Sequence, residues 1–173
     1  MKYVTAMLAL TFLVSCGDGK REAAEAASTA SEPAATWLID LREHDLPLEV
    51  DLGDRATLRV DSASVVWNEE FGELRVNAGE HFAISISEEP GDIARLKADL
   101  ERDMLRKHTV LEETPEKVVY RSQFPDEDIV FIHFYRLVPV GDRTFVVRDA
   151  AEGRFNEADV QRMVAAVRVL EVS

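Results

Sequence analysis

The sequence predicts a single α+β domain in which an antiparallel β-sheet is covered by two helices. Three observations support this fold class. Short segments in which apolar and polar residues alternate fill most of residues 37–173, as expected for strands that bury one face. Two other segments repeat their apolar residues every three or four positions, which is typical of amphipathic helices. The order is strands, helix, antiparallel strands, helix, and it favours two helices packed on one sheet.

Composition and charge limit the classes of function. The chain has 173 residues, of which 46% are hydrophobic and 31% are charged, so one domain with a sizeable core is expected. Its 20 Lys+Arg and 33 Asp+Glu give a formal net charge of -13, which repels phosphate backbones and anionic lipid head groups. We therefore expect no nucleic-acid partner. The single cysteine excludes an intramolecular disulfide, so the core must supply the stability.

The N-terminal segment has the features of a bacterial export signal. Lys2 supplies a positive charge, and residues 4–14 are apolar except for two threonines. This stretch is too short to span a bilayer, which needs about 20 predominantly apolar residues, and no later segment approaches that length. The stretch ends in Leu13-Val14-Ser15-Cys16. This tetrapeptide resembles the lipobox of bacterial lipoproteins, in which a small residue directly precedes the cysteine.

The resemblance implies that Cys16 is the site of lipid attachment. Its thiol would carry a diacylglycerol, and cleavage before it would make it the mature N-terminus. Two or three acyl chains then hold a protein on a membrane, because each buried methylene contributes about 0.8 kcal/mol. The alternative is a core thiol after a buried helix, and it is disfavoured because a polar tract begins at Gly17. We expect a cell-envelope protein whose domain lies in the periplasm or on the cell surface.

The segment after Cys16 predicts a flexible tether. Residues 17–36 are small, polar or charged, and they contain no bulky apolar side chain that could be buried. The chain is accordingly divided into a signal peptide over residues 1–15, a lipidated cysteine with its tether over 16–36, and one globular domain over 37–173.

The first half of the domain predicts five strands. They are residues 46–50, 56–60, 64–67, 73–76 and 81–86. Gly53-Asp54 supplies a turn between the first two. The last two flank Asn77-Ala78-Gly79-Glu80 and form the clearest hairpin. Its inward side chains are expected to be Leu74, Val76, Phe82, Ile84 and Ile86.

A helical period follows Pro90-Gly91. Asp92 is the expected N-cap. The apolar face is formed by Ile93, Leu96, Leu100 and Met104.

The second half predicts four strands and a terminal helix. The strands are residues 109–111, 117–123, 128–138 and 143–149. Because residues 130–135 are apolar on both faces, the third strand is expected to be central and covered on both sides. Asn156 and Asp159 form a capping-box pattern at the start of the helix. The helix is expected to continue through Val160, Met163, Val164 and Val167.

This order of elements resembles the compact sandwich of the PsbP-like superfamily, which includes photosystem extrinsic subunits and many small bacterial lipoproteins. The resemblance covers about residues 46–170. It is carried by Phe82-Ala-Ile-Ser-Ile before the first helix and by Tyr135 to Asp149 before the last one. It implies an α/β/α sandwich and no particular activity.

No catalytic motif is present in the sequence. It contains no G-x-S-x-G, S-x-x-K, P-loop or dinucleotide fingerprint. The four histidines (His44, His81, His108 and His133) form no H-x-x-x-H or H-E-x-x-H pair, so no metal and no other cofactor are expected. His133 is interpreted as a hydrogen-bonded sheet residue rather than a ligand or base.

Acidic and aromatic residues give weaker signals. Acidic clusters occur at Glu69-Glu70, Glu88-Glu89, Glu112-Glu113 and Asp126-Glu127-Asp128. The last suggests calcium, but the D-x-D-x-D-G spacing is absent, so solvated turn residues are expected. Trp37 and Trp67 could line a ligand groove, although core or edge cover is the commoner role of such residues.

Two classes of function remain. The leading hypothesis is a non-catalytic binding or accessory module of unknown ligand that engages an envelope protein or component through a sheet edge or its acidic face. The alternative is a small envelope hydrolase or cation-dependent enzyme with a site assembled from His133, Tyr135 and Asp126. An enzyme should bring these side chains together in a concave pocket with perturbed pKa values.

Overall fold

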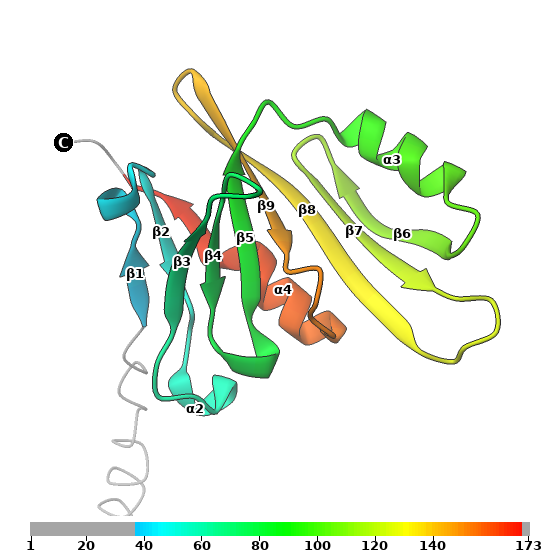
Figure 1. Ribbon diagram of the computed structural model, residues 1–173, viewed down its shortest axis with the longest axis horizontal. Coiled ribbons are helices and arrows are strands. Elements are labelled where there is room, and N and C mark those ends of the chain that lie inside the picture. Colours follow the sequence, from blue (N-terminus) through cyan, green and yellow to red (C-terminus); the bar gives the residue numbers. More distant parts are fainter. Residues whose placement is uncertain (1–36, 171–173) are drawn as a thin grey trace, which may run out of the picture. The chain divides into compact units, whose positions relative to one another are not determined.

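A computed structural model describes residues 37–170, which all belong to one compact unit (Figure 1). This part of the chain is α+β, with two antiparallel sheets and three α-helices. The seven strands of the larger sheet, in spatial order, are β3 (Ser64–Asn68), β4 (Glu73–Asn77), β5 (Ala83–Glu88), β9 (Arg143–Asp149), β8 (Val130–Val140), β7 (Lys117–Gln123) and β6 (Lys107–Thr114).

A second sheet has three strands. In spatial order they are β1 (Leu38–Asp40), β2 (Leu48–Asp51) and β10 (Val167–Val169). The helices are α2 (Arg55–Leu58), α3 (Ile93–Arg102) and α4 (Glu157–Ala166), and two 3-10 turns are η1 (Arg42–His44) and η2 (Gly79–His81).

The core lies on one face of the larger sheet. Leu74 pairs with Ile86 across β4 and β5, and Val76 pairs with Ile84 on the same face. All four side chains are fully buried. Apolar residues of β2, α4 and β10 belong to the same core cluster. Helix α4 lies behind β5 and β9 in Figure 1 and packs on β8 and β9. This face therefore holds most of the apolar surface that folding buries.

Several predicted elements are confirmed. Hairpin β4–β5 buries its inward side chains, and β7 and β9 have the expected bounds of 117–123 and 143–149. The carboxylate of Asp92 accepts the Arg95 amide at 2.8 Å and caps α3. Asn156 and Asp159 form a reciprocal capping box on α4, which fixes the first turn of that helix.

Other predictions are wrong. Residues 56–60 are not a strand, because the Asp54 side chain accepts the Ala56 amide and starts the short helix α2, which ends at left-handed Arg59. Strand β8 is an interior strand between β9 and β7, as expected, but it is not covered on both faces, because only Phe134 and Val138 of its side chains are buried. Val167 begins β10 instead of continuing α4. The apolar face expected for the first helix is only partly used, since Met104 lies beyond α3 and is 96% exposed.

Coverage of the sheet by two helices is not confirmed. Helix α3 contains no buried residue. The smaller sheet instead contributes Leu48, Val50 and Val167 to the core. The signal peptide, Cys16 and the tether lie outside the described residues. Among residues 37–170, no helix is long and apolar enough to cross a membrane.

Candidate functional site

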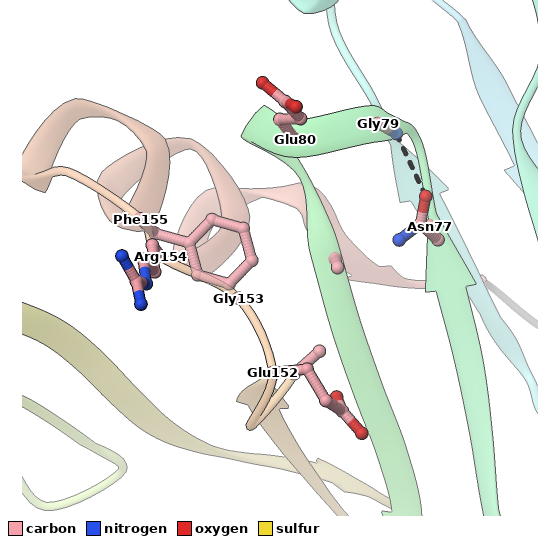
Figure 2. Close-up of a pocket in the computed structure, with 9 residues that line it drawn as sticks. Asn77, Gly79, Glu80, Glu152, Gly153, Arg154 and Phe155 are labelled. Atoms are coloured by element: carbon pink, nitrogen blue, oxygen red, sulfur yellow. Dashed lines mark hydrogen bonds between the residues drawn. The ribbon is translucent and has the colours of Figure 1, made fainter.

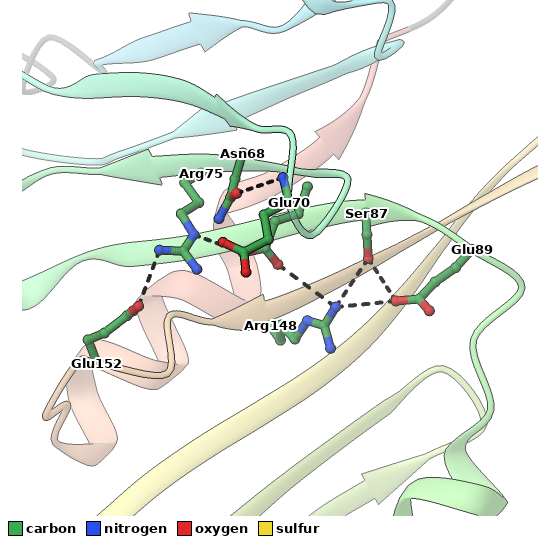
Figure 3. A network of polar contacts seen from close by, with 8 residues as sticks. Asn68, Glu70, Arg75, Ser87, Glu89, Arg148 and Glu152 are labelled. Carbon is green, nitrogen blue, oxygen red and sulfur yellow. Dashed lines mark hydrogen bonds and ion pairs between the residues drawn. The ribbon is translucent and has the colours of Figure 1, made fainter.

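Polar side chains gather on the face of the larger sheet opposite the core (Figure 3). Strand register places them there: Glu73 pairs with Ser87, and Ser85 lies between Arg75 and Arg148. These residues therefore alternate with the buried apolar ones along the same strands. We call Glu73, Arg75, Ser87 and Arg148 the polar face.

Ion pairs neutralise both arginines of the polar face. Arg75 donates to Glu73 at 2.8 Å and to Glu152 at 3.2 Å. Arg148 lies 3.4 Å from Glu89 and 3.9 Å from Glu73, whose side chain is 8% exposed. Because a carboxylate already faces each guanidinium, an incoming anion would have to displace a native partner.

Two further polar groups complete this network in Figure 3. The hydroxyl of Ser87 donates to Glu89 at 2.7 Å. At the turn after β3, the Asn68 side chain accepts the Glu70 amide at 3.2 Å. Both contacts are local and order the loops that border the polar face.

His133 is paired with a carboxylate that the sequence did not reveal. Its Nδ1 lies 2.7 Å from Oδ2 of Asp149, and the other oxygen of Asp149 accepts the Phe134 amide at 2.8 Å. The Asp149 side chain is only 4% exposed. One carboxylate thus holds both a histidine ring and a buried main-chain donor at the end of β9.

The neighbouring ring is Tyr120, whose centroid lies 5.2 Å from that of His133. Burial, reinforced by the negative charge of Asp149, raises the pKa of Tyr120 to about 12. A phenol with this pKa stays protonated at neutral pH and is a poor general base. The His133–Asp149 pair therefore has no activated nucleophile in Tyr120.

A second histidine–aspartate pair anchors the start of β6. His108 contacts Asp103 through Nε2 at 2.8 Å and Ser122 through Nδ1 at 2.7 Å. Its hydrogen bond to Asp103, with two main-chain amides that also donate to Asp103, holds the pKa of that carboxyl well below its usual range. Both ring nitrogens of His108 are therefore engaged within the fold.

The three residues of the enzyme hypothesis do not converge. Tyr135 and His133 share a face of β8, but the Tyr135 hydroxyl accepts the Asp92 amide at 3.1 Å and thereby fixes the start of α3. Asp126 is exposed in the loop between β7 and β8. Within residues 37–170, no hydrogen bond or ion pair joins Asp126 to His133 or Tyr135.

Two of the four acidic clusters, Glu88-Glu89 and Glu112-Glu113, are paired with cations. Glu113 lies 2.9 Å from Lys97, and Glu112 lies 2.6 Å from Lys117, whose hydrogen bond lowers the pKa of Glu112. Glu88 binds Arg143 at 2.7 Å, and this contact likewise lowers the pKa of Glu88. In the described part of the chain, no three His, Cys, Asp or Glu side chains are arranged to hold a metal ion.

Several hollows that could accept a ligand open on the surface of the described residues, including one of about 580 Å³ beside Tyr135 and Arg148 and two smaller ones. The first, of about 460 Å³, lies beside η2 and the loop after β9, where Glu80, Glu152, Arg154 and Phe155 point around the opening (Figure 2). The Gly79 amide donates to Asn77 at 3.0 Å and shapes one side of it. This hollow contains two carboxylates and one guanidinium but neither His nor Cys.

The second hollow has a volume of about 530 Å³ and lies beside Trp67. His44, Asp45, Glu88 and Arg143 also line it. Arg143 is held by both the Glu88 carboxylate and the Asp45 carbonyl. Trp67 is 48% exposed. The other tryptophan, Trp37, lies 4.3 Å from the Arg55 guanidinium and does not line this hollow, which we call the Trp67 groove.

Comparison of the chain with models of known protein families, with curated proteins and with solved structures finds no significant match.

Proposed function

We propose that this protein is a lipid-anchored, extracytoplasmic binding module without catalytic activity. The observation that supports the anchor is the lipobox-like Leu13-Val14-Ser15-Cys16 directly after an apolar signal-like segment. Acyl chains on Cys16 would attach the domain to a membrane of the cell envelope, and residues 17–36 would give it reach. The partner would be an envelope protein or another envelope component.

Pairing of two histidines and of the polar-face arginines within the fold supports binding over catalysis. His133 and His108 each contact an aspartate, and the nearest phenol, Tyr120, has a raised pKa. A binding module needs only an accessible surface, and the domain has open hollows and exposed apolar residues.

The first experiment is intact-mass analysis of the protein extracted from membranes, together with a Cys16→Ala variant. A mature chain that begins at Cys16 and carries an acyl mass increment is expected, and the variant should lack that increment. Crosslinking in the same membranes, followed by pull-down, should then yield a reproducible partner. An uncut signal with an unmodified Cys16 would overturn the anchor and the localisation together.

The second candidate is an envelope hydrolase that uses the His133–Asp149 pair. The 2.7 Å contact is the geometry in which a carboxylate orients a histidine base. A screen with ester, phosphoester and peptide substrates tests this candidate. Turnover that disappears in both His133→Ala and Asp149→Asn, while the variants stay folded, would favour the enzyme.

We also propose the finer fold assignment, a PsbP-like sandwich. The order of helices and strands over residues 46–170 supports it. An experimental structure that superimposes on a PsbP-like protein over the seven-stranded sheet and α4 would establish the assignment. A different strand order in PsbP-like proteins would refute the assignment.

A further inference from the structure

Open sheet edges attract other strands, and proteins usually protect them with charges, bulges or short length. Four strands form edges in the described part of the chain: β3, β6, β1 and β10. Three are protected. Strands β1 and β10 have three residues each. Strand β6 changes register between Val110 and Glu112 and carries the ion pairs of Glu112 and Glu113.

The β3 edge lacks these protections. Its sequence, Ser-Val-Val-Trp-Asn, contains no charged residue and no proline, and its register with β4 is regular over all five pairs. Within residues 37–170, β4 is the only strand that pairs with it, and no main-chain hydrogen bond from a turn or loop reaches residues 64–68. Val66 is 57% exposed and Trp67 is 48% exposed. The free main-chain groups of β3 are thus available to a further strand.

The charge around β3 selects the occupant. Residues 61–70 contain three exposed carboxylates (Asp61, Glu69 and Glu70) and no Lys or Arg. Antiparallel pairing of two copies through β3 would place Asp61 of one near Glu69 and Glu70 of the other, which is repulsive. A cationic segment would instead be attracted to both ends of the strand.

The Trp67 groove adds a place for a side chain. Trp67 pairs with Leu74, so its ring projects toward the core side of the sheet, where Ile86 and Glu88 also line the groove. A strand added to β3 would direct alternate side chains toward this side. A lysine or arginine there would meet the Trp67 ring and the Asp45 carboxylate, beside the Glu88–Arg143 ion pair, and the aromatic ring favours a cation.

We propose that the β3 edge takes up an extended, Lys- or Arg-rich segment of a partner protein as an eighth strand, with alternate side chains in the Trp67 groove. Main-chain pairing supplies the attraction, and the groove with its acidic surroundings supplies the preference for cations. This inference rests on the proposed binding function and names the site and the partner chemistry.

Peptide binding to the full chain in detergent tests the proposal. A Trp37→Phe background leaves Trp67 as the sole tryptophan, so its fluorescence reports on the groove. The probe is an alternating Lys-Val peptide of about six residues, long enough to pair with β3. One control peptide carries N-methyl groups on alternate amides, which blocks strand pairing but preserves charge. A second control replaces each Lys with Glu.

The Lys-Val peptide should change Trp67 fluorescence and protect β3 amides from hydrogen exchange. N-methylation should weaken binding about tenfold, and the Glu-Val peptide should not bind. Glu69→Gln/Glu70→Gln should weaken binding about threefold, and added salt should weaken it too. The matched variant Asp126→Asn/Asp128→Asn removes the same charge from a loop away from β3 and should bind as the parent does.

Three results would overturn the proposal: equal binding of the N-methylated peptide, protection elsewhere than β3, or a chain that dimerises through β3 and excludes the peptide. A competition experiment between the Lys-Val peptide and the membrane partner distinguishes failure of the β3 proposal from failure of the proposed binding function. If a partner crosslinks in membranes and excess Lys-Val peptide does not displace it, the edge assignment fails and the binding module stands. If the lipidated chain crosslinks no partner, the proposed function fails. The peptide-binding results then decide by themselves whether β3 takes up a cationic strand.

Discussion

The buried Asp149 carboxylate allows a sharp test of how much its two hydrogen bonds contribute to the free energy of unfolding. It accepts the buried Phe134 amide at 2.8 Å and contacts His133 at 2.7 Å, and it is nearly inaccessible to water. Asp149→Ala removes a hydrogen bond to a charged group and leaves the Phe134 amide without an acceptor. Each loss costs roughly 1–3 kcal/mol, so the free energy of unfolding should fall by about 3 kcal/mol.

Asp149→Asn separates the two contributions. The amide keeps an oxygen that can accept the Phe134 amide, so the loss should be smaller, about 1 kcal/mol. For a domain of this size, the two variants should lower Tm by roughly 10 °C and 3 °C. Urea unfolding followed by circular dichroism at neutral pH measures the free energies.

Two outcomes would refute this reasoning. A cost below about 1 kcal/mol for Asp149→Ala would mean that water or another group replaces the carboxylate at little expense. Equal costs for both variants would mean that charge, and not the acceptor for Phe134, is what matters. His133→Ala serves as the control, because it removes the histidine contact while the Phe134 amide keeps its acceptor.

Three further predictions concern other parts of the fold. Asn156→Ala should destabilise the chain by about 1 kcal/mol in urea unfolding, because it removes the capping-box acceptor of α4. Burial raises the folded-state pKa of Tyr120 to about 12, above the unfolded value of about 10. The protonated phenol should therefore add stability that is present below about pH 10 and is lost between about pH 10 and pH 12. Tyr120→Phe should remove that part of the alkaline loss, as measured by unfolding at increasing pH. Gly91→Ala should greatly lower the yield of folded protein and the Tm. Gly91 has φ +60°, and an added Cβ would lie 2.3 Å from Leu137 and 2.9 Å from Val146. An unchanged Tm would show that the backbone at residue 91 moves freely.

Local signals predicted much of the fold. Alternation marked β4 and β5 because their core-facing side chains (Leu74, Val76, Ile84 and Ile86) are fully buried. The capping residues Asp92 and Asn156 marked two helix starts because their side chains satisfy main-chain amides. Residues 56–60 also alternate, but the Asp54 cap overrode this weak pattern and produced α2. The three-residue strands β1 and β10 carry too few residues to show any period.

The candidate sites depend on long-range pairing, which the sequence does not display. His133 was singled out, but its partner Asp149 is found only when β8 and β9 pair. Similarly, Arg75 meets Glu152, 77 positions away in the chain. Trp67 could be placed on a strand from the sequence. That its strand is an edge follows only from the strand order.

Buried side chains and the main chain of β3 differ in whether their hydrogen-bonding groups already have partners. In the described part of the chain, every buried side-chain nitrogen and oxygen has a partner. A substrate that recruited Asp149, His108 or Arg75 would therefore first have to break a native contact. The outer main-chain groups of β3 are different, because a new strand can pair with them and leave every existing hydrogen bond intact. Binding at this edge therefore leaves the hydrogen bonds of the fold intact, and this is the physical reason for which we propose a binding module.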